Sequence, residues 1–164
     1  MTEFQGDIAV RAFEKLPDKK LYVAGNGPMM EEMQRYVREH HMENVKFLGY
    51  LQKDEMSEKF YQAKAVIMTS QCYEAFAMTI AEAYSYGVPV IAGRVGNMDG
   101  MVQDGITGVK FTYNSAEDLA DKISAFDAMD LSVLKKNARA FYAERLRPED
   151  NYQKLIRIYE DISK

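Results

Sequence analysis

The stretch "AVIMTSQCYEAFAMTIAEAYSYGVPVIAG", residues 65–93, decides the fold class of this chain. It opens with a short apolar run at 65–70 that is typical of a buried strand, and residues 78–87 have the pattern of a helix closed by Gly87. A second apolar run, 88–93, follows directly. A strand, a helix and a strand in this order predict two parallel strands joined by a helical crossover.

The same alternation continues on the N-terminal side of this stretch. A helix that stops at Pro17 is predicted by four apolar residues at helical spacing: Ile8, Ala12, Phe13 and Leu16. A strand at 21–25 follows, then a helix at 28–41 with Pro28 at its first position, and then a strand at 45–49. Asp54 is positioned to cap the next helix.

On the C-terminal side, a glycine-rich connection leads to a strand at 108–113. Ser115 and Asp118 have the spacing of a capping box for a helix that runs to Phe126, and two further helices follow, one through Leu131 and one after Pro148. We therefore predict an α/β fold over residues 1–164. Its doubly wound, Rossmann-like parallel sheet has helices on both faces, and a helical tail ends the chain.

Composition excludes several classes of function. Hydrophobic residues make up 47% of the chain and charged residues 28%, which is globular composition, and no apolar run is long enough for a membrane span. The net charge is -4 with scattered Lys and Arg, so no nucleic-acid partner is expected. A single cysteine, Cys72, and no signal peptide favour a cytoplasmic location. His40 and His41 are expected to end a helix, and no metal site is predicted.

The start of the helix near Met78 is the candidate site. Backbone N–H groups from Phe76 to Thr79 are unpaired within such a helix and favour an anion, most naturally a phosphate. Glu74 precedes this start and Glu82 lies about one turn inside it, so each carboxylate can accept hydrogen bonds from hydroxyl groups beside the phosphate. A nucleotide-sugar, with its ribose, diphosphate and hexose, has this layout.

These residues resemble a known family. "EAFAMTIAE" (74–82) matches the E-x7-E motif of family-four retaining glycosyltransferases with the GT-B fold, and "EAYSYGVPVIAG" (82–93) is similar to its continuation. Three other segments occur in the order of the donor-binding C-terminal half of these enzymes: "LYVAGNGP" (21–28), "NVKFLGYL" (44–51) and "VGNMDGMVQDGITG" (95–108).

The resemblance implies transfer of a hexose from a nucleotide-diphosphate sugar to an acceptor hydroxyl, in polysaccharide or glycoconjugate synthesis, without cofactor or metal. It implies that Glu74 is the catalytic-site residue that holds hydroxyls of the donor sugar, and that Glu82 holds the ribose. Backbone groups would receive the diphosphate at Phe76, Ala77, Met78 and Thr79. Residues beside the nucleotide and its base would be Gly25, Gly27, Gly49, Tyr50 and Leu51.

The chain also departs from the family pattern. Ala75 and Ala77 replace usual glycines, and Gly100 replaces an acidic residue, next to Asp99. The first strand and its phosphate-binding Arg and Lys are missing, with Gln5 at the lysine position. Loss of two charge-assisted contacts would cost several kcal/mol. We expect the acceptor site in a separate N-terminal domain of the same enzyme, so this piece should bind nucleotide without transferring sugar. Any peripheral membrane association would occur through the full-length protein.

Other interpretations remain open. A non-catalytic nucleotide-sugar-binding module would explain the missing cations, and a sugar-nucleotide epimerase would use the same fold. A hydrolase needs two carboxylates that flank one bond, whereas Glu74 and Glu82 are staggered along the cleft. Cys72 is better explained as a small buried residue than as a nucleophile, because no histidine lies near it in the sequence.

Overall fold

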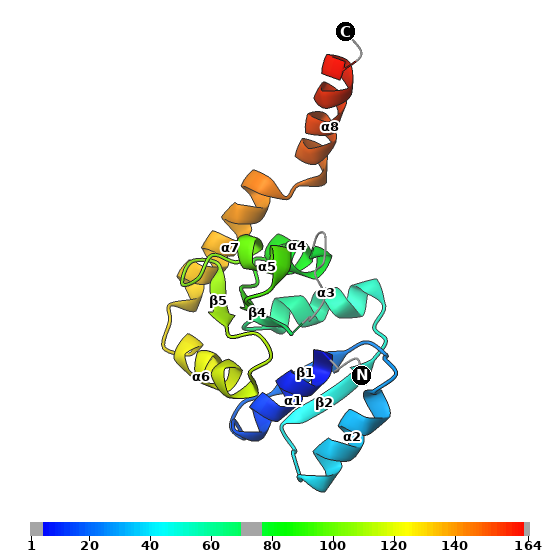
Figure 1. Cartoon of the computed structure of the whole chain (residues 1–164), viewed down its shortest axis with the longest axis vertical. Helices are drawn as coiled ribbons and strands as arrows, with labels where there is room; N and C mark the ends of the chain where they lie inside the picture. The colour runs from blue at the N-terminus through cyan, green and yellow to red at the C-terminus, as the bar shows by residue number, and fades with distance from the viewer. Residues whose placement is uncertain (1–4, 70–76, 163–164) are drawn as a thin grey trace.

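The computed structural model of the chain describes residues 5–69 and 77–162 (Figure 1). Helices and strands alternate through most of this range. The strands are β1 (Leu21–Ala24), β2 (Val45–Gly49), β3 (Val66–Met68), β4 (Val90–Gly93) and β5 (Gly108–Phe111). The helices are α1 (Gln5–Glu14), α2 (Met30–Glu39), α3 (Lys53–Gln62), α4 (Met78–Ser85), α5 (Gly96–Met101), α6 (Ala116–Phe126), α7 (Leu131–Arg145) and α8 (Pro148–Ile162).

The strands form two parallel ladders. β1 pairs with β2, with Leu21 opposite Val45, and β4 lies between β3 and β5. The predicted doubly wound class is confirmed, because every ladder is parallel and helices cover both faces. The sequence indicated one sheet, however, and the described strands are hydrogen-bonded as two separate groups. A space between β1 and β3 separates them.

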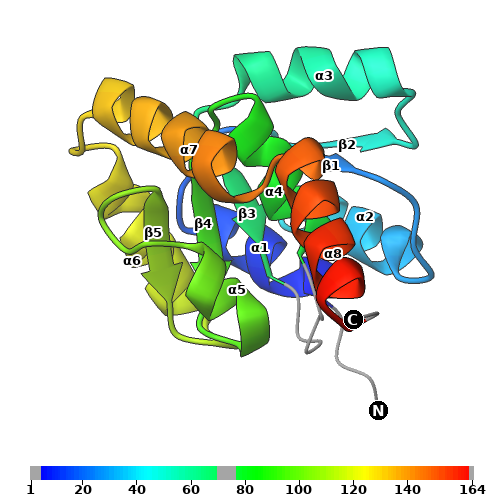
Figure 2. The same cartoon turned by 90° about the horizontal axis from the view of Figure 1, so that it is seen from above.

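Two apolar clusters fill the layers on either side of the strands. Figure 2 shows α3, α4 and α7 on one side and α1 and α6 on the other. Side chains alternate along β4, so Ile91 joins the cluster beneath α1 and α6, while Val90 and Ala92 join the cluster beneath α4 and α7. β4 is buried along its whole length. It therefore links the two halves of the core.

Among the described residues of the core, Tyr84 and Thr107 form a buried polar pair. Tyr84 on α4 is fully buried, and its hydroxyl lies 2.7 Å from Thr107 Oγ1, just before β5. Thr107 Oγ1 also accepts a hydrogen bond of 3.0 Å from the Gln103 backbone N–H. Burial raises the pKa of Tyr84 to about 12, so this side chain stays neutral and can donate a hydrogen bond. The pair fixes α4 against the turn that enters β5.

Several local expectations were wrong. The cap of α3 is Gln52, not Asp54: its side chain and that of Glu55 form a reciprocal capping box, with the Gln52 backbone N–H donating to Glu55 Oε2 at 2.7 Å. α2 begins at Met30, two residues after Pro28. The glycine-rich connection contains the short helix α5. β3 was expected to be buried, but it is only half-buried because one edge faces the space beside β1.

Half of the predicted capping box at α6 is present. Ser115 caps the helix by accepting the Asp118 backbone N–H at 3.1 Å. The Asp118 carboxylate does not return to Ser115; it accepts the backbone N–H of Thr112 at 2.5 Å. That bond from Thr112, before any other cause, lowers the pKa of Asp118. Asp118 thus ties the end of β5 to the start of α6.

Asp118→Asn should make the protein less stable at neutral pH and reduce its acid sensitivity. The folded-state pKa of Asp118 lies below the unfolded value of about 3.9, so its contribution is present above that value and is lost as pH falls through the folded pKa. We expect the free energy of unfolding at pH 7 to fall by roughly 1 kcal/mol. This is below the usual range for a hydrogen bond to a charged group, because Asp118 is only half-buried. Urea unfolding from pH 7 to pH 2 measures this difference. Asp121→Asn, an exposed carboxylate on the same helix, is the control; an equal effect there would contradict the role of the Thr112 bond.

The helical tail leaves the body of the domain. α8 projects away from the strands in Figure 1, and none of its described side chains is buried. Its exposed apolar side chains are Tyr152, Leu155, Ile158, Tyr159 and Ile162. Within the described ranges, none of the helices has the length and apolar character required to cross a membrane.

Candidate functional site

The loops after β1 and β2 meet at the carboxyl edge of their ladder. The Gly25 backbone N–H donates to the Gly49 carbonyl oxygen at 2.7 Å. Gly25 has φ +116° and Gly49 has φ +66°, conformations that favour glycine at both turns. Two of the predicted site residues are therefore brought together, because the glycines allow both chains to turn directly after their strands.

The remaining predicted residues of these two loops lie on either side of this contact. The Gly27 carbonyl accepts the Met30 backbone N–H at 3.0 Å and so closes the turn into α2. After β2, the side chain of Tyr50 is 70% exposed, and Leu51 is half-buried. The large exposed ring of Tyr50 is available for contact with a ligand placed beyond this edge.

Asn26 also lies at this edge, although it was not among the residues predicted from the sequence. A Cβ atom on Gly49 would lie 3.8 Å from Asn26 Oδ1, so this amide side chain lies close to the Gly25–Gly49 contact. Its amide offers both a donor and an acceptor at the carboxyl edge. The sequence contains a hint of this role in "GNGP" (25–28), where a polar residue lies between two glycines in a tight turn.

The first two residues of α4, Met78 and Thr79, have exposed side chains. Ala77 is the N-cap, and its side chain makes no capping hydrogen bond because alanine has no polar atom. Ala77 is buried, whereas Met78 and Thr79 are exposed. The Ile80 backbone N–H already bonds to the Ala77 carbonyl at 3.0 Å, so the amides of Met78 and Thr79 are the outermost of the helix. They carry the positive end of its dipole.

Glu82 lies one turn inside α4, and its side chain is exposed. Met78, Thr79 and Glu82 thus come from one helix whose start follows the carboxyl end of β3. Glu74 and Phe76 lie outside the described residues, as do Cys72 and Ala75. The roles predicted for all of these residues stay predictions.

Arg94, after β4, is held by carboxylates. Its Nη2 atom lies 2.8 Å from Asp104 Oδ2, and its Nη1 atom lies 3.9 Å from Asp99 Oδ1. Lys110 Nζ lies 2.9 Å from Asp99 Oδ1, and this hydrogen bond is the main cause that lowers the pKa of Asp99. Asp99, the acidic neighbour of Gly100, is therefore engaged with cations of this chain. The network fixes the loop after β4 against β5.

No group of three or more His, Cys, Asp or Glu side chains that could hold a metal ion occurs in the part of the chain that the structure describes. His40 ends α2: its Nδ1 atom lies 2.8 Å from the Tyr36 carbonyl oxygen, and its ring stacks on Tyr36 with centroids 3.8 Å apart. His41 follows with φ 51°. The two histidines occupy the end of a helix, as predicted.

These observations define a doubly wound α/β domain with glycine turns and an open helix start along one edge, the edge where such folds bind ligands. Residues 6–130 match the family model described as "Glycosyl transferases group 1". The chain belongs to this family of glycosyltransferases, and the predicted GT-B relationship is confirmed.

Curated relatives are longer than this chain. It is 29% identical over 157 residues to N-acetyl-alpha-D-glucosaminyl L-malate synthase of Bacillus anthracis, which covers 93% of this chain and 40% of that protein. It is 30% identical over 138 residues to a sulfoquinovosyl transferase of Arabidopsis thaliana, covering 81% of this chain and 26% of that protein. The matched part is thus between about a quarter and two fifths of these relatives.

Solved structures show the same fold. A glycosyltransferase from Rickettsia africae superposes with a TM-score of 0.86 at 23% identity, over 100% of this chain and 46% of that one. HepE from Anabaena, solved in complex with UDP, superposes with a TM-score of 0.87 at 22% identity, over 98% of this chain and 46% of that one. HepE has also been solved with UDP-glucose.

Proposed function

We propose that this chain supplies the donor-binding part of a retaining glycosyltransferase. The reaction is transfer of a hexose from a nucleotide-diphosphate sugar to an acceptor hydroxyl, in the synthesis of a polysaccharide or glycoconjugate. The match of residues 6–130 to the group 1 glycosyl transferases carries this proposal. The open start of α4 and the paired glycine turns at the same edge support it.

The donor diphosphate binds at the start of α4. The backbone amides of Met78 and Thr79 face an anion with the positive end of the helix dipole, and no side-chain cap at Ala77 competes for them. Glu82 would repel a phosphate, so its exposed carboxylate is assigned to hydroxyl groups of the ribose, one turn further along the helix.

The nucleobase end of the donor lies toward the other ladder. Gly25 and Gly49 allow a ligand to approach the backbone of the two loops closely, because neither residue has a Cβ atom. Tyr50 offers an exposed ring there, and Glu74 is assigned to hydroxyls of the donor hexose. The proposed reaction needs no cofactor or metal. The acceptor site belongs to another domain of the same enzyme. We assign the enzyme to the cytoplasm.

Thermal unfolding with UDP, GDP and ADP tests donor binding. A ligand present at a hundred times its dissociation constant stabilises the folded state by about 2.7 kcal/mol. For a chain of this size, that corresponds to a rise in melting temperature of roughly 5–10 °C. We expect one of the three diphosphates to give such a rise. Absence of a shift with all three, at millimolar concentration, would overturn the proposal.

Glu82→Gln tests the assignment of the ribose. A hydrogen bond to a charged group contributes about 1.5–3 kcal/mol, so the variant should bind the same diphosphate roughly tenfold to a hundredfold more weakly. Glu160→Gln, an exposed glutamate on α8, is the matched control and should leave the shift unchanged. If the diphosphate raised the melting temperature of both variants equally, Glu82 would not contact the ligand.

The isolated chain should bind the nucleotide without transferring sugar. The acceptor site is assigned to a separate domain, and the lysine position of the family holds Gln5. A transfer assay with the matching nucleotide-hexose and simple sugar acceptors measures this. Product formed by the 164-residue chain would contradict the assignment of the acceptor site to another domain.

A further inference from the structure

The helix assigned to the donor diphosphate, α4, has hydrogen-bond partners for all of its last four carbonyl groups. A helix leaves these groups without partners of its own. The Glu82 carbonyl accepts the Ser85 hydroxyl at 2.7 Å, and the next two carbonyls accept backbone N–H groups of residues 86–88 at 2.9 to 3.1 Å. The last carbonyl, that of Ser85, accepts a hydrogen bond from Nη1 of Arg139 on α7. A side chain from another helix therefore completes the carbonyl end of α4.

α7 lies directly against this end of α4. Gly87, with φ +68°, faces α7 so closely that a Cβ atom on it would lie 3.3 Å from the Lys135 carbonyl oxygen and 3.6 Å from Arg139 Cβ. Because glycine has no Cβ atom, the two helices can approach near enough for Arg139 to bond to α4. The Arg139 guanidinium also lies over the Tyr142 ring, with Cζ 5.3 Å from the ring centroid. This second contact holds the guanidinium in place.

Arg139 supplies a positive charge that α4 itself lacks. The carbonyl end of a helix carries the negative end of its dipole, where a cation is stabilising and a carboxylate is not. α4 has no basic residue in its last turn, and its carboxylate, Glu82, lies in its second half. Among the described residues, no carboxylate forms an ion pair with Arg139. The charge of Arg139 therefore offsets both the dipole end and the carboxylate.

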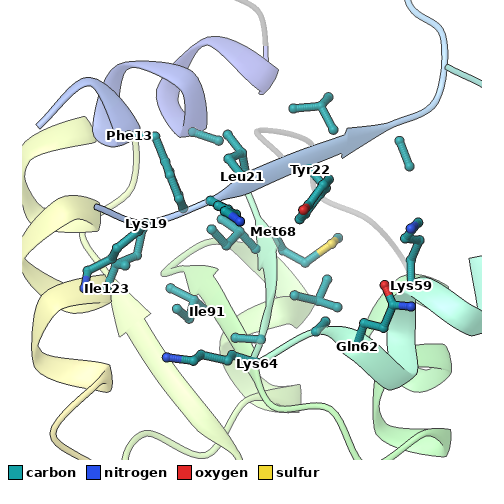
Figure 3. A pocket seen from close by; sticks show the side chains of 18 of the residues that line it. Phe13, Lys19, Leu21, Tyr22, Lys59, Gln62, Lys64, Met68, Ile91 and Ile123 are labelled. Atoms are coloured by element: carbon teal, nitrogen blue, oxygen red, sulfur yellow. The ribbon is translucent and has the colours of Figure 1, made fainter. Parts of the chain in front are cut away.

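The amide end of α4 is less enclosed than its carbonyl end. Ala77 provides no capping side chain, and Thr79 lines a cavity of about 870 Å³ between the two ladders (Figure 3). The ladders are tied at the opposite end of their strands, where Asp127 forms ion pairs with Lys19, before β1, and with Lys64, before β3. The position of the amide end therefore depends on how the rest of the helix is held.

We propose that Arg139 is a positioning residue for the donor, which acts by holding the carbonyl end of α4. This inference rests on the function proposed above, in which the amides of Met78 and Thr79 bind the diphosphate. α4 has eight residues and is about 12 Å long, so a movement of one end carries the other with it. The same dipole favours the cation at one end and the diphosphate at the other. Loss of the guanidinium leaves the Ser85 carbonyl without this donor and loosens the last turn.

Arg139→Ala tests this role through two readouts, the affinity for a nucleoside diphosphate and the melting temperature without ligand. The probe is whichever of UDP, GDP and ADP stabilises the parent chain, and calorimetric titration gives the dissociation constant. We expect the variant to bind the diphosphate about threefold to tenfold more weakly. Circular dichroism at the titration temperature checks that it is folded. If it is not, Arg139→Gln, which keeps a donor but no charge, replaces it in the same comparison.

Three further variants separate positioning from other effects. Asp130→Ala removes the side chain that caps α7 by accepting the N–H groups of Ser132 and Val133, so it should lower the melting temperature without changing the affinity. Arg145→Ala removes the same charge from α7, and its guanidinium lies over the Phe141 ring rather than at the end of α4, so the affinity should again be that of the parent. Arg139→Lys keeps a cation that can donate and should recover most of the affinity.

The outcomes separate this inference from the function on which it rests. A loss of affinity confined to the alanine or glutamine variant of Arg139, with recovery by lysine, supports the positioning role. Parent affinity in that variant, an equal loss in Asp130→Ala or Arg145→Ala, or no recovery by lysine overturns it and leaves donor binding intact. A parent chain that binds none of the three diphosphates would overturn the proposed function, and this inference with it.

Discussion

Gly108→Ala is expected to lower the free energy of unfolding by at least about 3 kcal/mol. Gly108 begins β5 and pairs with Val90 of the central strand β4. A Cβ atom there would lie 1.8 Å from the Val90 carbonyl oxygen, and 2.8 and 2.9 Å from its backbone carbon and nitrogen. These are backbone atoms of a fully buried strand, so no side-chain rotation relieves the overlap. Urea unfolding followed by circular dichroism measures the loss.

Gly100→Ala is the matched control for this substitution. Gly100 lies within α5, and a Cβ atom on it meets no atom within 4 Å. In a helix, alanine is more favourable than glycine by roughly 0.5–1 kcal/mol, so this variant should be as stable as the parent or slightly more stable. A similar loss in both variants would mean that the contact with Val90 is not the cause.

Leu134→Ala should lower the free energy of unfolding by about 3–5 kcal/mol. Leu134 is 2% exposed and belongs to the cluster beneath α1 and α6, while Ala138 and Phe141 of the same helix belong to the other cluster. Truncation therefore leaves a cavity where α7 crosses from one half of the core to the other. Denaturant unfolding should show a lower midpoint.

The tail provides the control for the leucine substitution. Leu155 on α8 is 49% exposed, so Leu155→Ala removes the same atoms without opening a buried cavity. Its effect should stay within about 0.5 kcal/mol, the usual range for surface positions. If Leu155→Ala cost as much as Leu134→Ala, α8 would have to pack on the domain in solution.

Most of the fold could be predicted because strands and helices leave different periodicities in the sequence. The apolar runs at 45–49 and 88–93 contain β2 and β4, and the stripe through Leu131, Leu134, Ala138 and Phe141 identified α7. Helix starts were less predictable. Asp54 has a better capping propensity than Gln52, but the reciprocal bond between Gln52 and Glu55 decides the start of α3.

Long-range pairing left no local signal. Nothing in the runs 21–25 and 65–70 shows that their strands border the same cavity, because a strand's neighbours depend on the order of the whole sheet. The candidate site was predictable where backbone chemistry defines it, as at Gly25 and Gly49. The roles of Asn26 and Arg94 depended on contacts with Gly49, Asp99 and Asp104 that only the folded chain reveals.

The ion pairs of Asp127 have a mechanical consequence for the carboxyl edge. One carboxylate ties together the segments that precede β1 and β3, so the amino ends of the two ladders are held close to each other. The Gly25–Gly49 turn belongs to the β1–β2 ladder, and α4 connects β3 and β4 of the other ladder. A donor bound as proposed would contact both and would connect the two ladders at the end opposite these ion pairs.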